Sequence, residues 1–213
     1  MIVVIGSPHL RFRASKQEAA GKAVGVGAAT AAAGADVELV GKIGDDPAGE
    51  VVLLDLAARE IGHVAILRDP SRPTPETVEP DVDAEPFEEP EGEQHSTNTP
   101  AGPTLEPADI ELALQYLPDY RVLVVAEPLA RAALDVVLAA SRWSGAALVI
   151  VLPHGADPVD IPGATILEAP AGDPDDAFAS VVGGYAAALD RGEEPAEAFT
   201  SASTASGWAA AAD

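Results

Sequence analysis

The residues best suited to chemistry are three aspartates near the C-terminus. Asp173, Asp175 and Asp176 stand at the start of a predicted helix over residues 176–190. Clustered carboxylates can bind a hard cation such as Mg²⁺ or Ca²⁺. Acidic residues at a helix start also stabilise the helix through its dipole, without any ligand. We favour this second interpretation and assign no metal site.

Two further candidates each follow a predicted buried strand. Glu127 follows a strand over 122–126, and His154 follows one over 146–152. Ligands of parallel sheets bind beyond the carboxyl ends of the strands, so either side chain could face a ligand. Glu127 could equally cap the next helix, and His154 could be an ordinary loop residue. No serine lies in a Gly-x-Ser-x-Gly sequence, so a serine hydrolase has no support.

The composition excludes several classes of function. The 213 residues include no cysteine, which removes disulfides, thiolate nucleophiles and cysteine-ligated metals. The net charge of −23 argues against nucleic acid and anionic membranes as partners. No apolar stretch approaches the roughly 18 residues of a membrane span, and no signal peptide is visible. We therefore expect a cytoplasmic protein whose partner is a small molecule.

Strands alternate with helices along the chain. This order predicts an α/β fold with a mostly parallel sheet covered on both faces. The predicted strands cover residues 2–5, 37–40, 63–67, 122–126, 146–152 and 164–167, and the predicted helices cover 16–33, 46–60, 108–117, 129–143, 176–190 and 195–211.

Residues 69–107 differ from the rest in composition. They contain nine prolines and eleven acidic residues, with weak alternation only around Val78 and Val82. Such a stretch is typical of a loop, a flap or a disordered insertion. We expect one domain over 1–213, with 69–107 as an acidic, proline-rich insertion or a lid remnant. Within it, we expect 75–104 to be mobile or poorly packed.

Three segments, in this order, carry a family resemblance. Residues 40–50 read Val-Gly-Lys-Ile-Gly-Asp-Asp-Pro-Ala-Gly-Glu, residues 127–129 read Glu-Pro-Leu, and residues 176–178 read Asp-Ala-Phe. They resemble the vGkvGdDpfGe, gEiPl and GAGDaF segments of PfkB/ribokinase-type carbohydrate kinases. The resemblance covers most of the chain outside 75–104. It implies a three-layer α/β/α sandwich with a mostly parallel sheet, and ATP and Mg²⁺ as cofactors if the chain is active.

The resemblance also implies roles for individual residues. The Asp-Ala-Phe match makes Asp176 the base that takes the proton of the acceptor hydroxyl, while an Ala-Gly-Asp match makes it Asp173. The family's substrate-binding positions correspond here to Lys22, Gly25, Gly44, Asp46 and Glu127.

The departures from the family pattern oppose phosphoryl transfer. The family binds phosphate with glycine amides, but Asp173, Pro174 and Asp175 precede Asp176 here. Proline donates no N–H, and each aspartate would oppose a phosphate charge by about 3 kcal/mol at about 5 Å and a dielectric constant of about 20. Gly25 replaces an asparagine that binds the sugar. The Asn-x-x-Glu motif and the last adenine-contacting segment have no counterpart, so we expect a fold reduced on its nucleotide side.

These departures lead to two hypotheses of function. The first is a degenerate homologue of the kinases that acts as a binding or scaffold protein, with a homodimer left open. The second is an active, small, ATP-dependent carbohydrate or nucleoside kinase whose base is Asp176 or Asp173. The broken glycine anion hole favours the first hypothesis.

Overall fold

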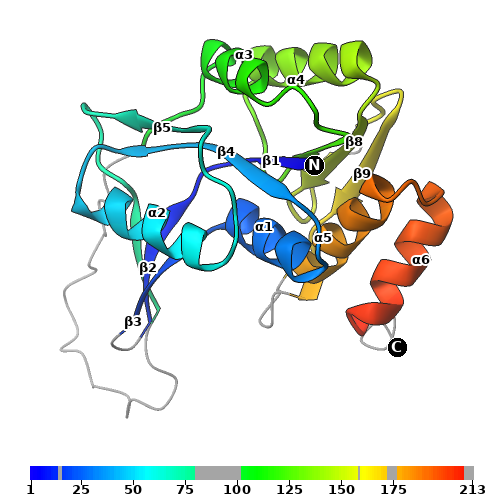
Figure 1. The fold of residues 1–213 in the computed structure, drawn as a ribbon, viewed down its shortest axis with the longest axis horizontal. Helices are drawn as coiled ribbons and strands as arrows, with labels where there is room; N and C mark the ends of the chain where they lie inside the picture. Colours follow the sequence, from blue (N-terminus) through cyan, green and yellow to red (C-terminus); the bar gives the residue numbers. More distant parts are fainter. Residues whose placement is uncertain (14–15, 80–101, 158, 172–176, 209–213) are drawn as a thin grey trace.

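The computed structural model describes residues 1–13, 16–79, 102–157, 159–171 and 177–208 (Figure 1). The expectation that residues 75–104 are mobile therefore falls mostly on residues outside this description. Within the described residues, no helix is both long and apolar enough to cross a membrane.

A six-stranded parallel sheet forms the centre of the fold. Strand β1 lies in the middle and is buried along its whole length, as expected for a strand covered on both faces. The strand order is β5-β4-β1-β7-β8-β9. The strands are β1 (Ile2–Ile5), β4 (Val37–Gly44), β5 (Ile66–Asp69), β7 (Val122–Val125), β8 (Ala147–Leu152) and β9 (Ala164–Glu168).

Helices cover the two faces of this sheet, so the predicted α/β sandwich is confirmed. Helices α3 (Pro107–Tyr116) and α4 (Arg131–Ser144) lie on one face. The other face is covered by α1 (Lys22–Ala32) and α5 (Ala177–Asp190), with α6 (Pro195–Ala205) packed on α5. Helix α2 (Pro47–Ala58) packs against β4 and against a second, smaller sheet.

Helices α1 and α5 approach each other closely because of a glycine. A Cβ atom on Gly183 would lie 2.6 Å from Cβ of Ala29 and 2.8 Å from the backbone nitrogen of Thr30. Real Cβ atoms do not come this close to other atoms, so any larger residue would push the two helices apart. This contact matters for the site because both helices begin at the same pocket.

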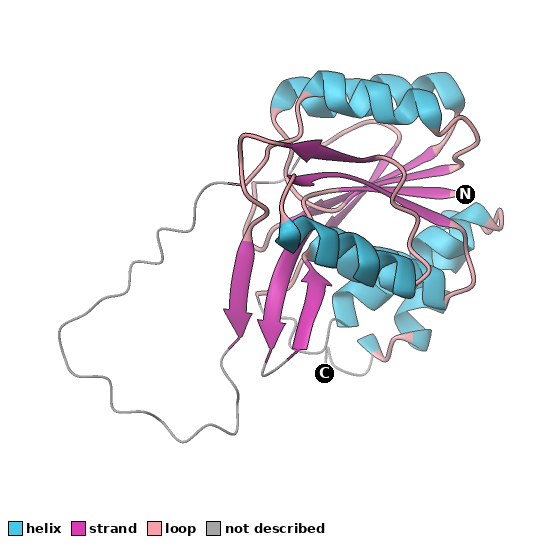
Figure 2. Cartoon of the chain, turned by 60° about the vertical axis from the view of Figure 1, so that its left-hand side comes forward, coloured by secondary structure: helices cyan, strands magenta, loops and turns pink. Residues whose placement is uncertain are grey.

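The smaller sheet corrects the sequence prediction. It contains β2 (His9–Arg13), β3 (Lys16–Ala20) and β6 (Glu76–Glu79), and we call it the lid sheet (Figure 2). Strand β2 pairs antiparallel with β3 and parallel with β6. The predicted helix over 16–33 is therefore wrong in its first part, since residues 16–20 pair with β2. The helix begins only after Gly21, whose φ of 115° is not helical.

Several predicted boundaries also shift. The predicted strand over 37–40 extends to Gly44, and the one over 63–67 becomes Ile66–Asp69. The two changes have one cause, because Ile66–Asp69 pairs in register with Gly41–Gly44. The start of α2 is as predicted, since Asp46 caps it by accepting a hydrogen bond from the Gly49 backbone at 2.8 Å.

Candidate functional site

A pocket of about 760 Å³ lies between the lid sheet and the carboxyl ends of β7, β8 and β9. The starts of α1 and α5 complete its walls. This is the position at which ligands of open parallel sheets bind. The pocket is therefore the candidate site.

The wall on the lid side is polar. His9, Arg11, Thr77 and Glu79 line it from the lid sheet, and Arg59 lines it from the end of α2. Burial lowers the pKa of His9, and the nearby Arg11 lowers it further, against the opposing charge of Glu127. His9 is therefore mostly neutral at pH 7, and the arginines provide the positive charge of this wall.

The opposite wall is apolar. Ala126, Val151, Pro153 and Ala169 line it at the ends of the central strands, and Phe178 lines it from the first turn of α5. Phe178 in turn packs against Trp208, with ring centroids 5.6 Å apart. These side chains offer surface for packing and no hydrogen-bonding groups.

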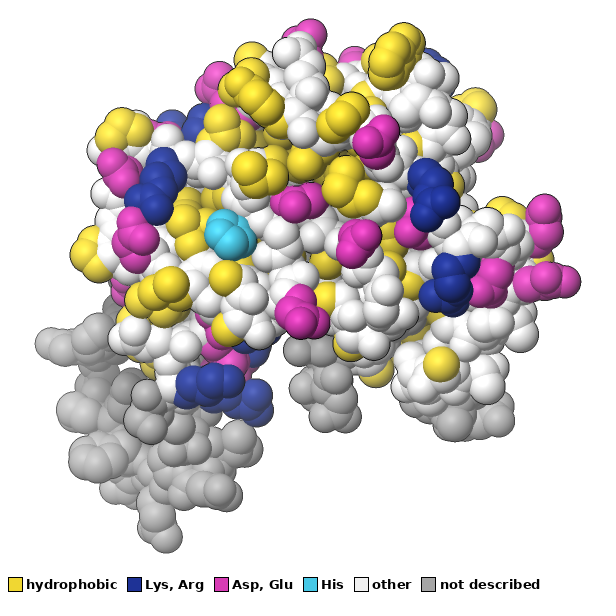
Figure 3. Space-filling model, viewed as in Figure 1, with side chains coloured by type: hydrophobic (Ala, Val, Ile, Leu, Met, Phe, Trp, Pro, Cys, Tyr) yellow, Lys and Arg dark blue, Asp and Glu magenta, His cyan; other side chains and the backbone are white. Residues whose placement is uncertain are grey.

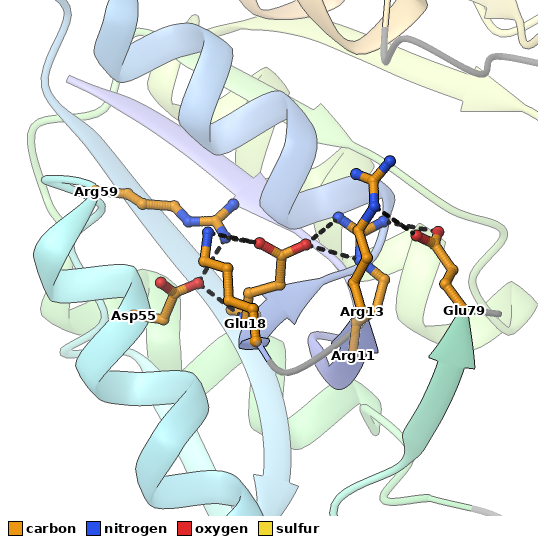
Figure 4. Close-up of polar contacts among 8 residues, drawn as sticks. Arg11, Arg13, Glu18, Asp55, Arg59 and Glu79 are labelled. Carbon is orange, nitrogen blue, oxygen red and sulfur yellow. Dashed lines mark hydrogen bonds and ion pairs between the residues drawn. The ribbon is translucent and has the colours of Figure 1, made fainter. Parts of the chain in front are cut away.

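A buried carboxylate organises the lid sheet (Figure 4). The side chain of Glu18 is 9% exposed, and it accepts hydrogen bonds from Arg11 at 3.0 and 2.7 Å. Lys16 lies 3.0 Å away and Arg59 lies 3.6 Å away. Burial alone would raise the pKa of Glu18, but the hydrogen bonds from Lys16 and Arg11 outweigh it and lower the pKa. Glu18 is therefore ionised and holds three cations together.

Further contacts join the strands of the lid sheet to one another and to α2. Asp55 of α2 accepts a hydrogen bond from the backbone of Ala19 at 2.7 Å and pairs with Arg59 at 2.6 Å. Arg11 also pairs with Glu79 at 3.2 Å, which joins β2 to β6. The lid sheet is thus held over the pocket by charged contacts to α2.

Two of the predicted substrate-binding residues, Lys22 and Gly25, line the pocket. A Cβ on Gly25 would lie 3.2 Å from Cβ of Ala179 in α5, so the packing of α1 on α5 leaves little room for a side chain here. Glu127 lies two residues beyond the end of β7 and is half-buried beside Gly6 and His9, next to the lining residue Ala126.

The other two predicted substrate-binding residues, Gly44 and Asp46, belong to a hydrogen-bonded turn. The backbone nitrogen of Gly44 donates to Oγ1 of Thr74 at 2.9 Å. Thr74 in turn donates to Asp46 from Oγ1 at 2.7 Å and from its backbone nitrogen at 2.8 Å. Neither Gly44 nor Asp46 is among the residues that line the pocket, and these bonds give both a structural role.

The predicted catalytic and anion-binding residues Asp173, Pro174, Asp175 and Asp176 lie outside the described residues. Their roles therefore stay predictions. Ala171 and Phe178, which stand on either side of them in the sequence, both line the pocket.

The carboxyl end of β8 carries one further polar pair. His154 lines the pocket, and its Nδ1 lies 3.4 Å from the carboxylate of Glu168. Glu168 also accepts a hydrogen bond from the backbone of Gly155 at 2.9 Å. Within the described residues, no three histidine or carboxylate side chains are grouped so that they could hold a metal ion.

The sequence prediction misses Arg11, Thr77, Glu79 and Arg59. The sequence signal for β2 is the alternation of polar and apolar residues in His9–Arg13, which is typical of a half-buried strand. Arg59 has no such signal, because only the packing of α2 against the lid sheet brings it to the pocket.

The fold is that of the PfkB/ribokinase-type carbohydrate kinases, so the resemblance found in the sequence is confirmed at the level of the fold. Three solved structures illustrate the match. Sa239 matches with a TM-score of 0.70 and 15% identity, over 96% of this chain and 92% of its own. A PfkB protein from Polaromonas sp. JS666 matches with a TM-score of 0.67 and 16% identity, over 94% of this chain and 92% of its own. A carbohydrate kinase from Agrobacterium tumefaciens matches with a TM-score of 0.67 and 15% identity, over 96% of this chain and 89% of its own. No family model and no curated protein matches the sequence.

Proposed function

We propose that this chain is a ligand-binding homologue of the PfkB/ribokinase-type kinases that transfers phosphoryl groups poorly or not at all. The observation that carries the proposal is the apolar wall at the ends of β7, β8 and β9. Phosphoryl transfer needs cations or preorganised N–H groups around the phosphates. Ala126, Val151, Pro153 and Ala169 provide no such side chains. Apart from His154, which follows β8, the basic residues among the described lining lie on the other side, at the lid sheet, the end of α2 and the start of α1.

ATP and Mg²⁺ are the cofactors that the fold implies, and the residues present fit them poorly. Among the described residues, no three histidine or carboxylate side chains lie close enough together to hold a metal ion without help from a ligand. By sequence, Asp173 and Asp175 add negative charge and Pro174 removes an N–H donor where the family binds phosphate. We therefore derive no reaction step through ATP. A scaffold role, a homodimer, a cytoplasmic location and the division into one domain with a lid are further parts of this proposal.

The alternative is an active kinase with Asp176 or Asp173 as the base. The position of the pocket favours it, because the residues flanking this acidic segment line the same cavity as Lys22. In this reading, the acceptor hydroxyl would lie near the start of α5, where a carboxylate could take its proton.

Restoring the family's anion hole tests the proposal. The triple variant Asp173→Gly, Pro174→Ala and Asp175→Gly should bind inorganic phosphate about tenfold to a hundredfold more tightly, because it gains N–H donors and loses two negative charges. Asp119→Gly, an exposed acid elsewhere on the surface, is the matched control and should change nothing.

The parent chain provides the decisive comparison. We expect no measurable phosphoryl transfer from ATP to ribose, fructose or adenosine. Turnover of about 1 s⁻¹ or more, the usual range of kinases, would overturn the proposal. If the folded triple variant binds phosphate no better than the parent, Asp173 becomes the better candidate for the base and the active-kinase reading gains support.

A further inference from the structure

Several basic residues of this acidic chain lie on one side of the pocket. Of its twelve lysines and arginines, Arg11, Lys22 and Arg59 line the pocket. Arg13 and Lys16 lie beside them in the lid sheet, where they pair with Glu79 and Glu18. Figure 3 shows lysine and arginine side chains in dark blue close to the position of the lid sheet in Figure 1. The chain as a whole carries a net charge of −23, so this grouping is a local reversal of its charge.

Among the described residues that line the pocket, the cations Arg11, Lys22 and Arg59 outnumber the single carboxylate, Glu79. Behind this lining, Glu18 and Asp55 pair with Arg11 and Arg59, and Glu127 lies near His9. Glu18 alone is shared among Arg11, Lys16 and Arg59. Lys22 has no ion-pair partner among the residues that the structure describes, and the first turn of α1 contains no acidic residue. An excess of cations beside a cavity attracts an anion.

The opposite wall selects against a ligand covered with hydroxyl groups. Ala126, Val151, Pro153 and Ala169 cannot hydrogen-bond the hydroxyls of a neutral sugar, so placing them there would cost their hydration. The same wall, with the ring of Phe178, suits an apolar or aromatic group. The pocket is therefore amphipathic, with cations on one side and hydrocarbon on the other.

We infer that the pocket binds a small organic anion with an apolar body. Its carboxylate or phosphate group lies against Lys22, Arg11 and Arg59, and its body lies against the strand ends and Phe178. This inference rests on the proposed function, because it takes the pocket to be the ligand site. It adds that an anion is preferred to a neutral sugar.

Matched probes test this preference. Phenylacetate and its neutral isostere phenylacetamide differ in charge but hardly in shape, and ribose represents a neutral sugar. Calorimetry measures binding directly. A second readout is the fluorescence of Trp208, which packs on the lining residue Phe178. Trp143 is 89% exposed on α4, so the variant Trp143→Phe leaves Trp208 as the single tryptophan at little cost.

We expect phenylacetate to bind at least tenfold more tightly than phenylacetamide, and ribose to bind more weakly than both. Lys22→Gln should weaken phenylacetate binding about tenfold and leave phenylacetamide unchanged, because one cation near the ligand is lost. Arg59→Gln should act in the same direction. Arg131→Gln removes an exposed cation on α4 that does not line the pocket, and it should leave both affinities unchanged.

Three results would overturn the inference. These are equal affinity for the two phenyl probes, no binding of phenylacetate at millimolar concentration, and a preference that survives Lys22→Gln and Arg59→Gln in folded protein. Binding of ribose alone would overturn the anion preference and leave the proposed ligand-binding function standing. Phosphoryl transfer from ATP would instead overturn the proposed function and leave the anion preference standing.

Discussion

Replacing Asp46 by alanine is expected to lower the free energy of unfolding by about 3 kcal/mol without changing the pocket. The carboxylate of Asp46 accepts hydrogen bonds from the backbone of Gly49 at 2.8 Å and from the backbone and hydroxyl of Thr74 at 2.8 and 2.7 Å. Thr74 is buried, with 3% of its surface exposed, so water does not replace the lost acceptor there.

The magnitude follows from these three contacts. Loss of the N-cap interaction with Gly49 costs about 1 kcal/mol. Each of the two donors of Thr74 that is left unpaired costs about 1 kcal/mol more. For a chain of this length, a total of about 3 kcal/mol lowers the melting temperature by about 6–12 °C.

The effect of Asp46→Ala should depend on pH. Burial alone would raise the pKa of Asp46, but the hydrogen bonds from Thr74 and Gly49 outweigh it and lower the pKa. A group whose pKa is lowered by folding adds stability above its unfolded pKa and loses that contribution as the pH falls through its folded pKa. The difference between parent and variant should therefore shrink in acid.

Urea unfolding at pH 7 and at acid pH measures both effects. Asp45→Ala is the control, because Asp45 is exposed and its contact is a surface ion pair with Arg68 at 3.1 Å, which contributes little. A loss below 1 kcal/mol for Asp46→Ala, or one no larger than that of Asp45→Ala, would refute the reasoning.

Variants at Gly183 and Glu38 probe the packing of α1 against α5 and a carboxylate oxygen that is buried without a partner. Gly183→Leu should lower the free energy of unfolding, measured by thermal unfolding, by about 2–3 kcal/mol, because it forces α1 and α5 apart. The control Gly184→Ala, whose Cβ would lie 3.5 Å from Cβ of Ala202, should lower it by less than about 1 kcal/mol. Equal losses for the two variants would contradict the close approach of the helices. Burial raises the pKa of Glu38, and its Oε2 is buried without a hydrogen-bond partner. Glu38→Gln should therefore stabilise the protein by about 0.5–1 kcal/mol in urea unfolding at pH 7. A carboxylate whose pKa is raised by folding destabilises the fold only while it is ionised, and this penalty disappears as the pH falls and the group is protonated. The stability gained by Glu38→Gln should therefore shrink in acid. A gain that increased in acid would contradict a buried, unpaired carboxylate at Glu38.

The centre of the sheet could be predicted from the sequence because β1, β7 and β8 are short, continuous apolar runs. The start of α2 could be predicted from Asp46 and the proline after it. The lid sheet could not, since Lys16–Ala20 consists mostly of helix-forming residues, and its pairing with β2 overrides that preference.

Likewise, only part of the candidate site could be predicted from the sequence. Lys22 and Gly25 follow from the family resemblance, and the structure places both at the pocket. Arg11 and Arg59 are 48 positions apart in the sequence, and they meet at Glu18 only because α2 packs on the lid sheet. No local pattern reports such a contact, so the cationic side of the pocket emerges only from the tertiary structure.

Calorimetry with ATP and Mg²⁺ tests the central claim most directly. The described residues at the ends of β7, β8 and β9 that line the pocket are mostly apolar, so we expect ATP with Mg²⁺ to bind the parent chain with a dissociation constant of about 1 mM or weaker. Phenylacetate should give a measurable binding heat in the same preparation, which shows that the pocket is intact. Micromolar affinity for ATP and Mg²⁺ would overturn the proposed function and favour an active kinase.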